Sequence, residues 1–368
     1  MNNKEIKNPQ VNEKNPELNQ SNNSKHKFHT IELNKISEKT KNSFRIRTIT
    51  AIVLLLLCVP CLVLGEWSFF TAILVVLVAA TYEFVHVLRK KRYPKFVNIF
   101  TYLMTISLAF WPYFKSLYLA IFHNANIKTA VFSYGYNFLT TNIEISTIGI
   151  AILILVLYLF SILYDDFTVG DVGYLSGTSL LLILGIQSFF FLRYSPMSVQ
   201  VSGAYFNYGG YIYCSALLFT YVVIGTFGTD IGAYAFGILF GKNKINPRIS
   251  PNKTWAGFWG GILASSILSM IFGLVIVFNN IPLLYGILDS SHWYLIVFFS
   301  VLMPFVSTLG DFIFSAIKRY YDIKDFGNVL PGHGGVLDRV DSLLVTSIVV
   351  ALFILTYVLY FNGGVFIF

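Results

Sequence analysis

Charged residues and cysteines are both scarce in this sequence. Only 12% of its 368 residues are Asp, Glu, Lys or Arg, whereas 55% are hydrophobic and the mean hydropathy is +0.66. This balance excludes an ordinary soluble domain and is typical of an integral membrane protein. The cysteines indicate no redox or metal chemistry, because Cys58 and Cys61 lie within an apolar run and Cys214 has no partner nearby in the sequence.

Two common sequence signals are also missing. No segment repeats at a fixed period, so a repeat architecture is not predicted. The stretch GILFGK, residues 237–242, resembles a phosphate-binding loop, but its glycines stand one residue too close together and no Ser or Thr follows the lysine. We therefore predict no nucleotide site of that type.

Long apolar segments dominate what is present. Residues 1–47 are polar and basic and should form a disordered tail, and the runs that follow are long enough to cross about 30 Å of hydrocarbon. We expect about nine crossings, near 48–64, 67–88, 97–120, 145–164, 173–192, 209–240, 255–278, 292–315 and 338–361. The sixth is rich in glycine and is expected to be broken or unusually long. The predicted fold is an all-α, polytopic transmembrane helix bundle.

The basic connections predict the orientation, because short loops rich in Lys and Arg stay on the cytoplasmic side. Three connections are clearly basic: RKKRYPK at 89–95, GKNKINPRISPNK at 241–253, and the stretch at 315–342. With nine crossings and a cytoplasmic tail, all three fall on the cytoplasmic side. The C-terminal end then falls outside.

The stretch SAIKRYYDIKDFGNVLPGHGGVLDRVDS, residues 315–342, concentrates charge and glycine between two apolar runs. Asp311, Ser315 and Lys318 are spaced i, i+4, i+7, which puts a carboxylate, a hydroxyl and an ammonium along one helix face. The glycines that follow let backbone N–H groups approach a ligand closely. Such a loop suits phosphates.

Aspartates lie on both sides of this loop. Asp338 and Asp341 share a face at the start of the last crossing, where their oxygens suit Mg²⁺. Ordinary capping of a helix is the alternative for such a pair. Asp311, at the end of an apolar run, favours the metal site, because a carboxylate there is costly unless it serves an ion or a substrate. We predict a metal site formed by Asp311, Asp338 and Asp341.

A second constellation lies at TDIGAYAFGILFGKNKINPRISPNKTWAG, residues 229–257. Asp230 stands in an apolar stretch, and Tyr234 follows one turn later on the same face. The stretch then supplies cations and hydroxyl groups, at Lys242, Ser250, Lys253 and Thr254. A positive-inside loop would explain the cations but not the aspartate or the hydroxyls, so both interpretations stay open.

The second crossing carries two further ionisable residues, Glu83 and His86, spaced i, i+3. Ionisable groups in hydrocarbon are rare and usually face a cavity or a partner. A position at the cytoplasmic interface would explain them equally well, and we assign them no site role from the sequence.

The residues from Ser315 to Asp341 resemble the phosphatidate cytidylyltransferase, or CDP-diacylglycerol synthase, family. The pattern S-x-hydrophobic-K-R-x4-K-D followed by H-G-G-hydrophobic-x-D-R-hydrophobic-D is filled at every specified position. D-x-x-A-Y at Asp230 and S-P-x-K-T-W at Ser250 are also similar to the family. One departure is Ala256, where the family commonly has Glu or Gln. The detailed resemblance covers roughly residues 225–345.

The resemblance implies transfer of a cytidylyl group from CTP to phosphatidate, with CDP-diacylglycerol and pyrophosphate as products and Mg²⁺ as cofactor. It divides the chain into a tail at 1–47, N-terminal transmembrane helices at 48–220 and a C-terminal transmembrane catalytic region at 221–368. The expected setting is the plasma membrane, with the active site on the cytoplasmic side. The partners are the two substrates and the lipid bilayer, not nucleic acid, and a homodimer is one option for the assembly.

Taken with the residue chemistry, the resemblance implies two sets of site residues beside the metal ligands. The catalytic set is Asp311, Lys318, Arg319, His333, Asp338 and Arg339. The substrate-binding set is Asp230, Tyr234, Lys242, Ser250, Lys253, Thr254, Ser315, Lys324, Gly334, Gly335 and Ser342. No strong base is required, because the phosphatidate oxygen is already a nucleophile, so His333 could orient the loop or donate to a phosphate.

Three alternatives fit parts of the pattern. A cation transporter would also place aspartates in crossings, but it would not need a glycine-rich loop surrounded by Lys and Arg. A CTP-dependent polyprenol or phytol kinase is chemically closer, yet the complete pattern favours the cytidylyltransferase. The CDP-alcohol phosphotransferases carry aspartates that recur every four residues, whereas Asp338 and Asp341 are three apart.

Overall fold

The computed structural model describes residues 53, 56–90, 94–114, 143–198, 216–330 and 334–360. All of them belong to one unit, Leu33–Phe368. The predicted tail at 1–47, most of the first expected crossing at 48–64, and His333 lie outside the described residues.

Helices account for almost all of the described chain, because a backbone surrounded by lipid must satisfy its N–H and C=O groups internally. In chain order the helical elements are α2 (Glu66–His86), η1 (Val87–Lys90), α3 (Lys95–Ala109), α6 (Ile143–Leu163), α7 (Val169–Ser198), α8 (Ala216–Phe240), α9 (Trp255–Phe278), η3 (Ser290–His292), α10 (Trp293–Tyr320) and α11 (Leu337–Tyr360). The prediction of a polytopic helical membrane protein is confirmed.

Seven helices in the described part of the chain are long and apolar enough to cross a membrane. They correspond to seven of the nine expected crossings. The expected crossing at 97–120 coincides with α3, a shorter apolar helix, and with residues 115–120, which lie outside the described residues. The count of nine, and the orientation that depends on it, stay predictions.

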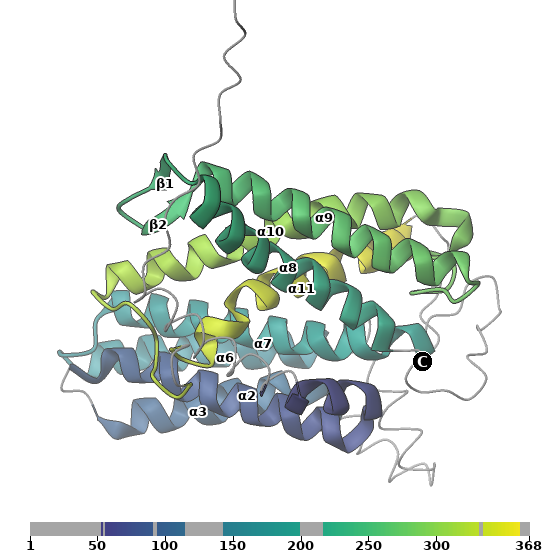
Figure 1. Cartoon of the computed structure of the whole chain (residues 1–368). Helices are drawn as coiled ribbons and strands as arrows, with labels where there is room; N and C mark the ends of the chain where they lie inside the picture. The colour runs from purple at the N-terminus through teal and green to yellow at the C-terminus, as the bar shows by residue number, and fades with distance from the viewer. Residues whose placement is uncertain are drawn as a thin grey trace, which may run out of the picture. The chain divides into compact units, whose positions relative to one another are not determined.

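The helices pack in two groups (Figure 1). Helices α2, α3, α6 and α7 contact one another, and α8, α9, α10 and α11 form the second set of contacts. Helix α11 lies between the groups, because it contacts α2 and α7 as well as α8 and α10. The predicted domain boundary after residue 220 lies inside α8.

The glycine-rich sixth crossing is one continuous helix of 25 residues, α8, so the expected break is absent there. Its glycines instead allow close packing against α9. A Cβ on Gly232 would stand 3.0 Å from Ala264 Cβ and 3.1 Å from Gly261 Cα. Small residues at a contact between membrane helices let two backbones approach closely. Ser265 Oγ also donates to the Gly225 carbonyl across this contact, at 2.5 Å.

Two short antiparallel strands, β1 (Lys244–Asn246) and β2 (Ser250–Thr254), interrupt the helical pattern between α8 and α9. The all-α prediction did not anticipate this hairpin. Pairing runs from Lys244 opposite Thr254 to Asn246 opposite Ser250. The hairpin keeps the basic connection compact and leads directly into α9, because Trp255 N–H donates to the Asn243 carbonyl at 3.0 Å.

Candidate active site

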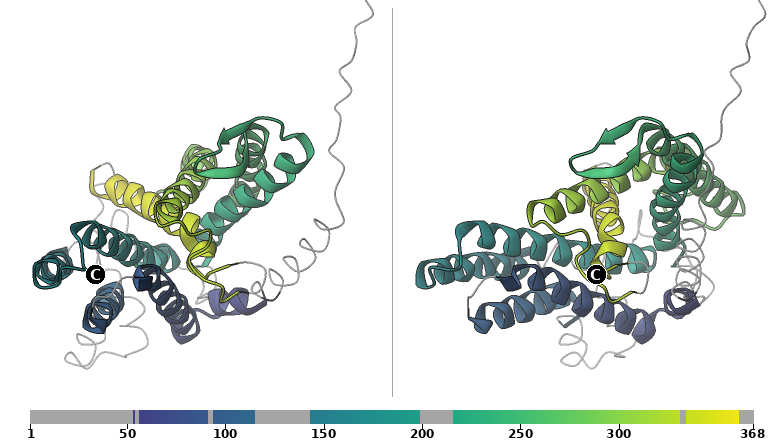
Figure 2. Two further views of the ribbon diagram at one scale, coloured as in Figure 1. Left: turned by 90° about the vertical axis from the view of Figure 1, so that its left-hand side faces the viewer. Right: turned by 60° about the vertical axis from the view of Figure 1, so that its left-hand side comes forward.

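Polar side chains gather where the β1–β2 hairpin, the end of α10 and the start of α11 meet. Figure 2 shows the hairpin and the segment that joins α10 to α11 on the same side of the helices. The basic, hydroxyl-rich hairpin belongs to one predicted constellation, residues 229–257. The charged end of α10 and the charged start of α11 belong to the other.

An ion pair joins the two constellations directly. Lys253 Nζ of β2 pairs with Asp311 Oδ2 of α10, and the same ammonium lies 4.0 Å from the centre of the Phe312 ring. Ser315 Oγ donates to Asp311 Oδ1 at 3.2 Å, as expected for residues one turn apart on a shared face. Both partners of the ion pair remain partly exposed, with side-chain accessibilities of 23% for Lys253 and 30% for Asp311. The Lys253 ammonium nitrogen itself is covered in this pairing, whereas Asp311 is the more open of the two side chains.

Arg319 forms a second link between hairpin and helix. Its Nε donates to the Ile249 carbonyl at 3.1 Å, and its Nη1 donates to the Ile323 carbonyl at 2.8 Å. These bonds tie the hairpin to the end of α10. The predicted catalytic residue therefore has a positioning role in this geometry.

Lys318 lies buried between two aspartates of α11. Its Nζ is 2.7 Å from Asp338 Oδ1 and 3.9 Å from Asp341 Oδ2. The predicted shared face of Asp338 and Asp341 is confirmed by this common partner. Buried charges are stable only when they are paired and hydrogen-bonded, so the ammonium fixes both carboxylates relative to α10.

Both carboxylate oxygens of Asp338 accept hydrogen bonds from the protein in this geometry. Besides Lys318, its carboxylate accepts N–H groups from Phe326 at 2.9 Å and from Gly335 at 3.0 Å. These contacts attach Asp338 to α10 and to the connecting loop, and its role as a metal ligand stays a prediction. The N–H groups that Asp338 accepts belong to residues before α11, so its contacts differ from ordinary capping of that helix.

Asp341 is the more available carboxylate at the start of α11. It accepts the Ser342 N–H at 2.7 Å and lies 3.3 Å from Ser342 Oγ. It is also close enough to Asp311 and Asp230 to interact with them electrostatically. Asp230 in turn interacts electrostatically with Asp311, Lys253 and Arg339. Three carboxylates from three helices are thus near enough to one another to interact electrostatically.

The donor chemistry of this place fits Mg²⁺, although no cage for it is preformed. Within the described residues, no group of three or more His, Cys, Asp or Glu side chains is arranged to hold a metal ion. Proteins usually bind Mg²⁺ through one or two carboxylates together with substrate phosphates and water, rather than through an all-protein cage. Asp311 and Asp341 are the two carboxylates that could serve in this way.

Several other predicted site residues, four substrate-binding and one catalytic (Arg339), are exposed or half-buried. Tyr234 lies one turn beyond Asp230 on α8 and is exposed, as are Lys242, Lys324 and Arg339, while Ser250 is half-buried in β2. Gly334 has a φ of +84°, which favours glycine because an L side chain is strained there. The Gly335 N–H donates to Asp338, so this group is not directed at a phosphate.

Thr254 has a structural explanation that differs from the predicted substrate contact. It is buried at the N-cap of α9, and its Oγ1 accepts the Gly257 N–H at 3.2 Å. This bond satisfies one of the backbone donors that the first helical turn leaves without a partner.

Thr254→Ala should therefore destabilise the protein by about 1 kcal/mol, because it removes the cap. Thr254→Ser, which keeps the hydroxyl, should behave like the wild type. Thermal unfolding in detergent measures both variants. Equal midpoints for the alanine and serine variants would contradict the capping role, and a changed KM with unchanged stability would restore the substrate role.

Sequence reasoning missed one residue that reaches this site. Glu83 of α2 is buried, and its carboxylate accepts the N–H groups of Val336 and Leu337 at 2.8 Å each. The only available signal was an ionisable residue in an apolar run, because its partners lie more than 250 positions away in the sequence.

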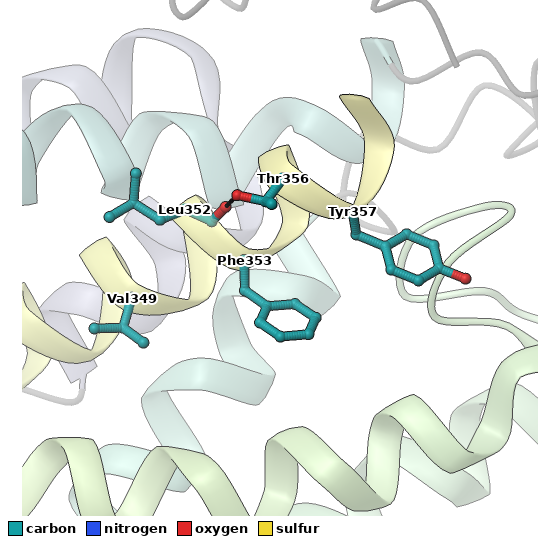
Figure 3. Close-up of a pocket in the computed structure, with 5 residues that line it drawn as sticks. All are labelled: Val349, Leu352, Phe353, Thr356 and Tyr357. Atoms are coloured by element: carbon teal, nitrogen blue, oxygen red, sulfur yellow. Dashed lines mark hydrogen bonds between the residues drawn. The ribbon is translucent and has the colours of Figure 1, made fainter. Parts of the chain in front are cut away.

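An apolar pocket on the distal half of α11 is separate from this site (Figure 3). Its volume is about 320 Å³, and it is lined by Val349, Leu352, Phe353, Thr356 and Tyr357. Of the two hydroxyl groups drawn there, Thr356 Oγ1 donates within the helix to the Leu352 carbonyl at 2.8 Å, and the other belongs to Tyr357. The pocket offers no charge for a phosphate.

The fold and the site define a polytopic membrane protein with a charged site at one end of its helices, built from carboxylates, lysines and an arginine. A comparison with family models adds the particular class. The model of the cytidylyltransferase family matches residues 45–357, most of the chain. The chain belongs to this family.

Curated relatives agree with this assignment. The chain is 47% identical over 124 residues to a phosphatidate cytidylyltransferase of Bacillus subtilis, a match that covers 34% of this chain and 42% of the relative. It is 40% identical over 128 residues to that of Staphylococcus saprophyticus, covering 35% and 44%. It is 32% identical over 176 residues to that of Mycobacterium tuberculosis, covering 48% and 47%. The matches thus span about half the length of these relatives.

Proposed function

We propose that the chain transfers a cytidylyl group from CTP to phosphatidate, giving CDP-diacylglycerol and pyrophosphate. The observation that carries the proposal is the meeting of Lys253, Asp311 and Asp341 at one end of a membrane helix bundle, in a member of the cytidylyltransferase family. The curated relatives named above support the choice of substrates.

The reaction makes modest demands on covalent catalysis. A phosphate oxygen of phosphatidate attacks the α-phosphorus of CTP, a new P–O bond forms, and the bond from that phosphorus to the oxygen bridging to the β-phosphate breaks. Pyrophosphate leaves with the bonding electrons. Because the attacking oxygen is already anionic, catalysis requires alignment of two polyanions and stabilisation of their charge more than a strong base.

The cations of the site suit this task in different ways. Arg339 is exposed, and the covered Lys253 ammonium lies beside Asp311, so both can neutralise phosphate groups in the site once Lys253 leaves Asp311. Lys318 is buried against Asp338 and Asp341 and holds the start of α11 in place. We assign phosphate neutralisation to Lys253 and Arg339, and positioning to Lys318.

Mg²⁺ is the cofactor that the carboxylates favour. Asp311 and Asp341 would hold it, with Asp230 nearby, and the bound ion would supply positive charge to the nucleotide phosphates. Asp311 is paired with Lys253 in the structure. If Asp311 exchanged Lys253 for Mg²⁺ when the nucleotide binds, the Lys253 ammonium would be released to pair with a phosphate.

The site should open to the cytoplasmic side of the plasma membrane. The basic segments at 89–95 and 241–253 support this placement, because short loops rich in Lys and Arg stay inside the cell. CTP is then available directly from the cytoplasm, and phosphatidate arrives from the adjoining lipid leaflet.

The test uses the purified full chain in vesicles that contain phosphatidate. With CTP and Mg²⁺ we expect CDP-diacylglycerol and pyrophosphate to form in equal amounts, measured by mass spectrometry and a pyrophosphate assay. Omission of phosphatidate or chelation of Mg²⁺ should stop both. Pyrophosphate release without the lipid product, or no turnover under any condition, would refute the proposed function.

A further inference from the structure

The carboxylate of Glu83 reaches from the N-terminal helix group into the start of α11. Glu83 lies near the end of α2 and is only 2% exposed. Its Oε1 accepts the Val336 N–H and its Oε2 accepts the Leu337 N–H, each at 2.8 Å. These contacts link two segments separated by more than 250 residues.

The two N–H groups are ones that α11 cannot satisfy by itself. Helix α11 begins at Leu337, and the first N–H groups of a helix have no partner within it. A carboxylate at this position supplies the acceptors and also interacts favourably with the positive end of the helix dipole. Glu83 therefore caps α11 from another helix.

The loop leaves room for this carboxylate by means of two glycines. A Cβ on Gly327 would stand 2.5 Å from Glu83 Oε1, and a Cβ on Gly335 would stand 2.5 Å from Glu83 Oε2. Real side chains do not tolerate such distances, so any other residue would displace Glu83 or the loop. Gly327 and Gly335 are thus needed to make room for the Glu83 carboxylate, whether or not the loop binds a phosphate.

Glu83 and Asp338 divide the donors of the loop between them. Asp338 accepts the N–H groups of Phe326 and Gly335, and Glu83 accepts the next two along the chain. Three consecutive N–H groups, at Gly335, Val336 and Leu337, are thereby held by two carboxylates. The position of the first turn of α11 depends on both.

A second contact secures the same junction from α7. The hydroxyl of Tyr174 donates to the Phe84 carbonyl at 2.9 Å, and the Tyr174 ring lies 4.5 Å from the ring of Tyr321 at the end of α10. The segment between α10 and α11 is therefore attached to the N-terminal helices at both ends. Helix α2 acts as part of the support of the site.

We propose that Glu83 is a positioning residue for cytidylyl transfer, which sets the place of Arg339 and Asp341 by holding the start of α11. This inference rests on the proposed function. Arg339 and Asp341 lie only two and four residues after Leu337, the second residue whose N–H group Glu83 accepts. A displacement of about 1 Å in a catalytic group can cost about 100-fold in rate.

The first test replaces the carboxylate by its amide. Glu83→Gln keeps the shape but points an NH₂ group at one of the two N–H donors, so kcat should fall about 10- to 100-fold. Exchange of the Val336 and Leu337 amides with deuterium should become faster by about tenfold or more. The matched control is Thr105→Val, which removes a buried 2.9 Å bond to Ser179 in the same helix group and should change neither quantity.

The second test asks for a specific rescue. Gly327→Ala should lower kcat, because the new methyl group collides with the Glu83 carboxylate. Glu83→Asp, shorter by one methylene, should make room, so the double variant should be more active than Gly327→Ala alone. Gly177→Ala, on α7 with nothing within 4 Å of the added carbon, should have no effect in either background.

Two results would overturn the inference: full activity with unchanged amide exchange in Glu83→Gln, or the same loss from Gly327→Ala in both backgrounds. If Glu83→Gln does not fold, the decision rests on whether Gly327→Ala with Glu83→Asp is more active than Gly327→Ala alone. If the wild type makes no CDP-diacylglycerol, the proposed function has failed, and the amide exchange of the same variants still measures whether Glu83 holds α11.

Discussion

Asp311→Asn is expected to lower turnover by at least about 100-fold while the protein stays folded and inserted in the membrane. The side chain pairs with Lys253, accepts a hydrogen bond from Ser315 and interacts with both Asp230 and Asp341. Asparagine fits the same space, but it lacks the charge that holds Lys253 and that would hold Mg²⁺. Removal of one preorganised electrostatic contact commonly costs 10²–10³ in rate.

Asp322→Asn provides the control for this prediction. Asp322 is an exposed aspartate just beyond α10, with a φ of 52°, a conformation that asparagine also adopts readily. The change in charge is the same, yet turnover should stay at the wild-type level. Normal turnover in Asp311→Asn at any Mg²⁺ concentration would remove Asp311 from the site.

Loss of Lys253 or Arg339 should have the next largest effect. Each is expected to neutralise phosphate charge that is stabilised in the transition state, so Lys253→Ala and Arg339→Ala should each weaken transition-state stabilisation by about 3 kcal/mol. Both cations interact with the same carboxylate, Asp230. Residues that act on one transition state are non-additive, so the double variant should lose less than the sum of the single losses.

Turnover of the three variants, with CTP and phosphatidate each varied, measures this coupling. Lys244→Ala changes an exposed lysine of the same hairpin, in β1, and should leave turnover unchanged. Full activity in Lys253→Ala would return the hairpin to the alternative interpretation, a positive-inside loop. Strictly additive losses would mean that the two cations act at separate steps or places.

Regular spacing made part of this site predictable from sequence. The i, i+4 spacing predicted that Ser315 and Asp311 share a face, and their hydroxyl and carboxylate are 3.2 Å apart. The basic and hydroxyl-rich segment at Ser250–Thr254 was predicted to matter, and Lys253 from it contacts Asp311. Helical periodicity and charge placement are local properties, so a single sequence carries them.

Other features depend on contacts between distant segments, which spacing cannot reveal. The partners of Glu83 lie at the start of another helix, and those of Asp338 are Lys318, Phe326 and Gly335. The glycines of α8 were expected to make the crossing broken or unusually long, whereas they permit the close approach of α9 within a continuous helix. The sequence marks each of these residues as unusual, but their contacts depend on how the helices pack in three dimensions.

The position of the transferred phosphorus tests the central claim most directly. Purified full chain in phosphatidate vesicles would receive CTP labelled with ³²P either at the α-phosphate or at the γ-phosphate. Cytidylyl transfer predicts that only the α-label enters the lipid, while the γ-label leaves in pyrophosphate. Entry of the γ-label into the lipid would identify a CTP-dependent kinase and contradict the account.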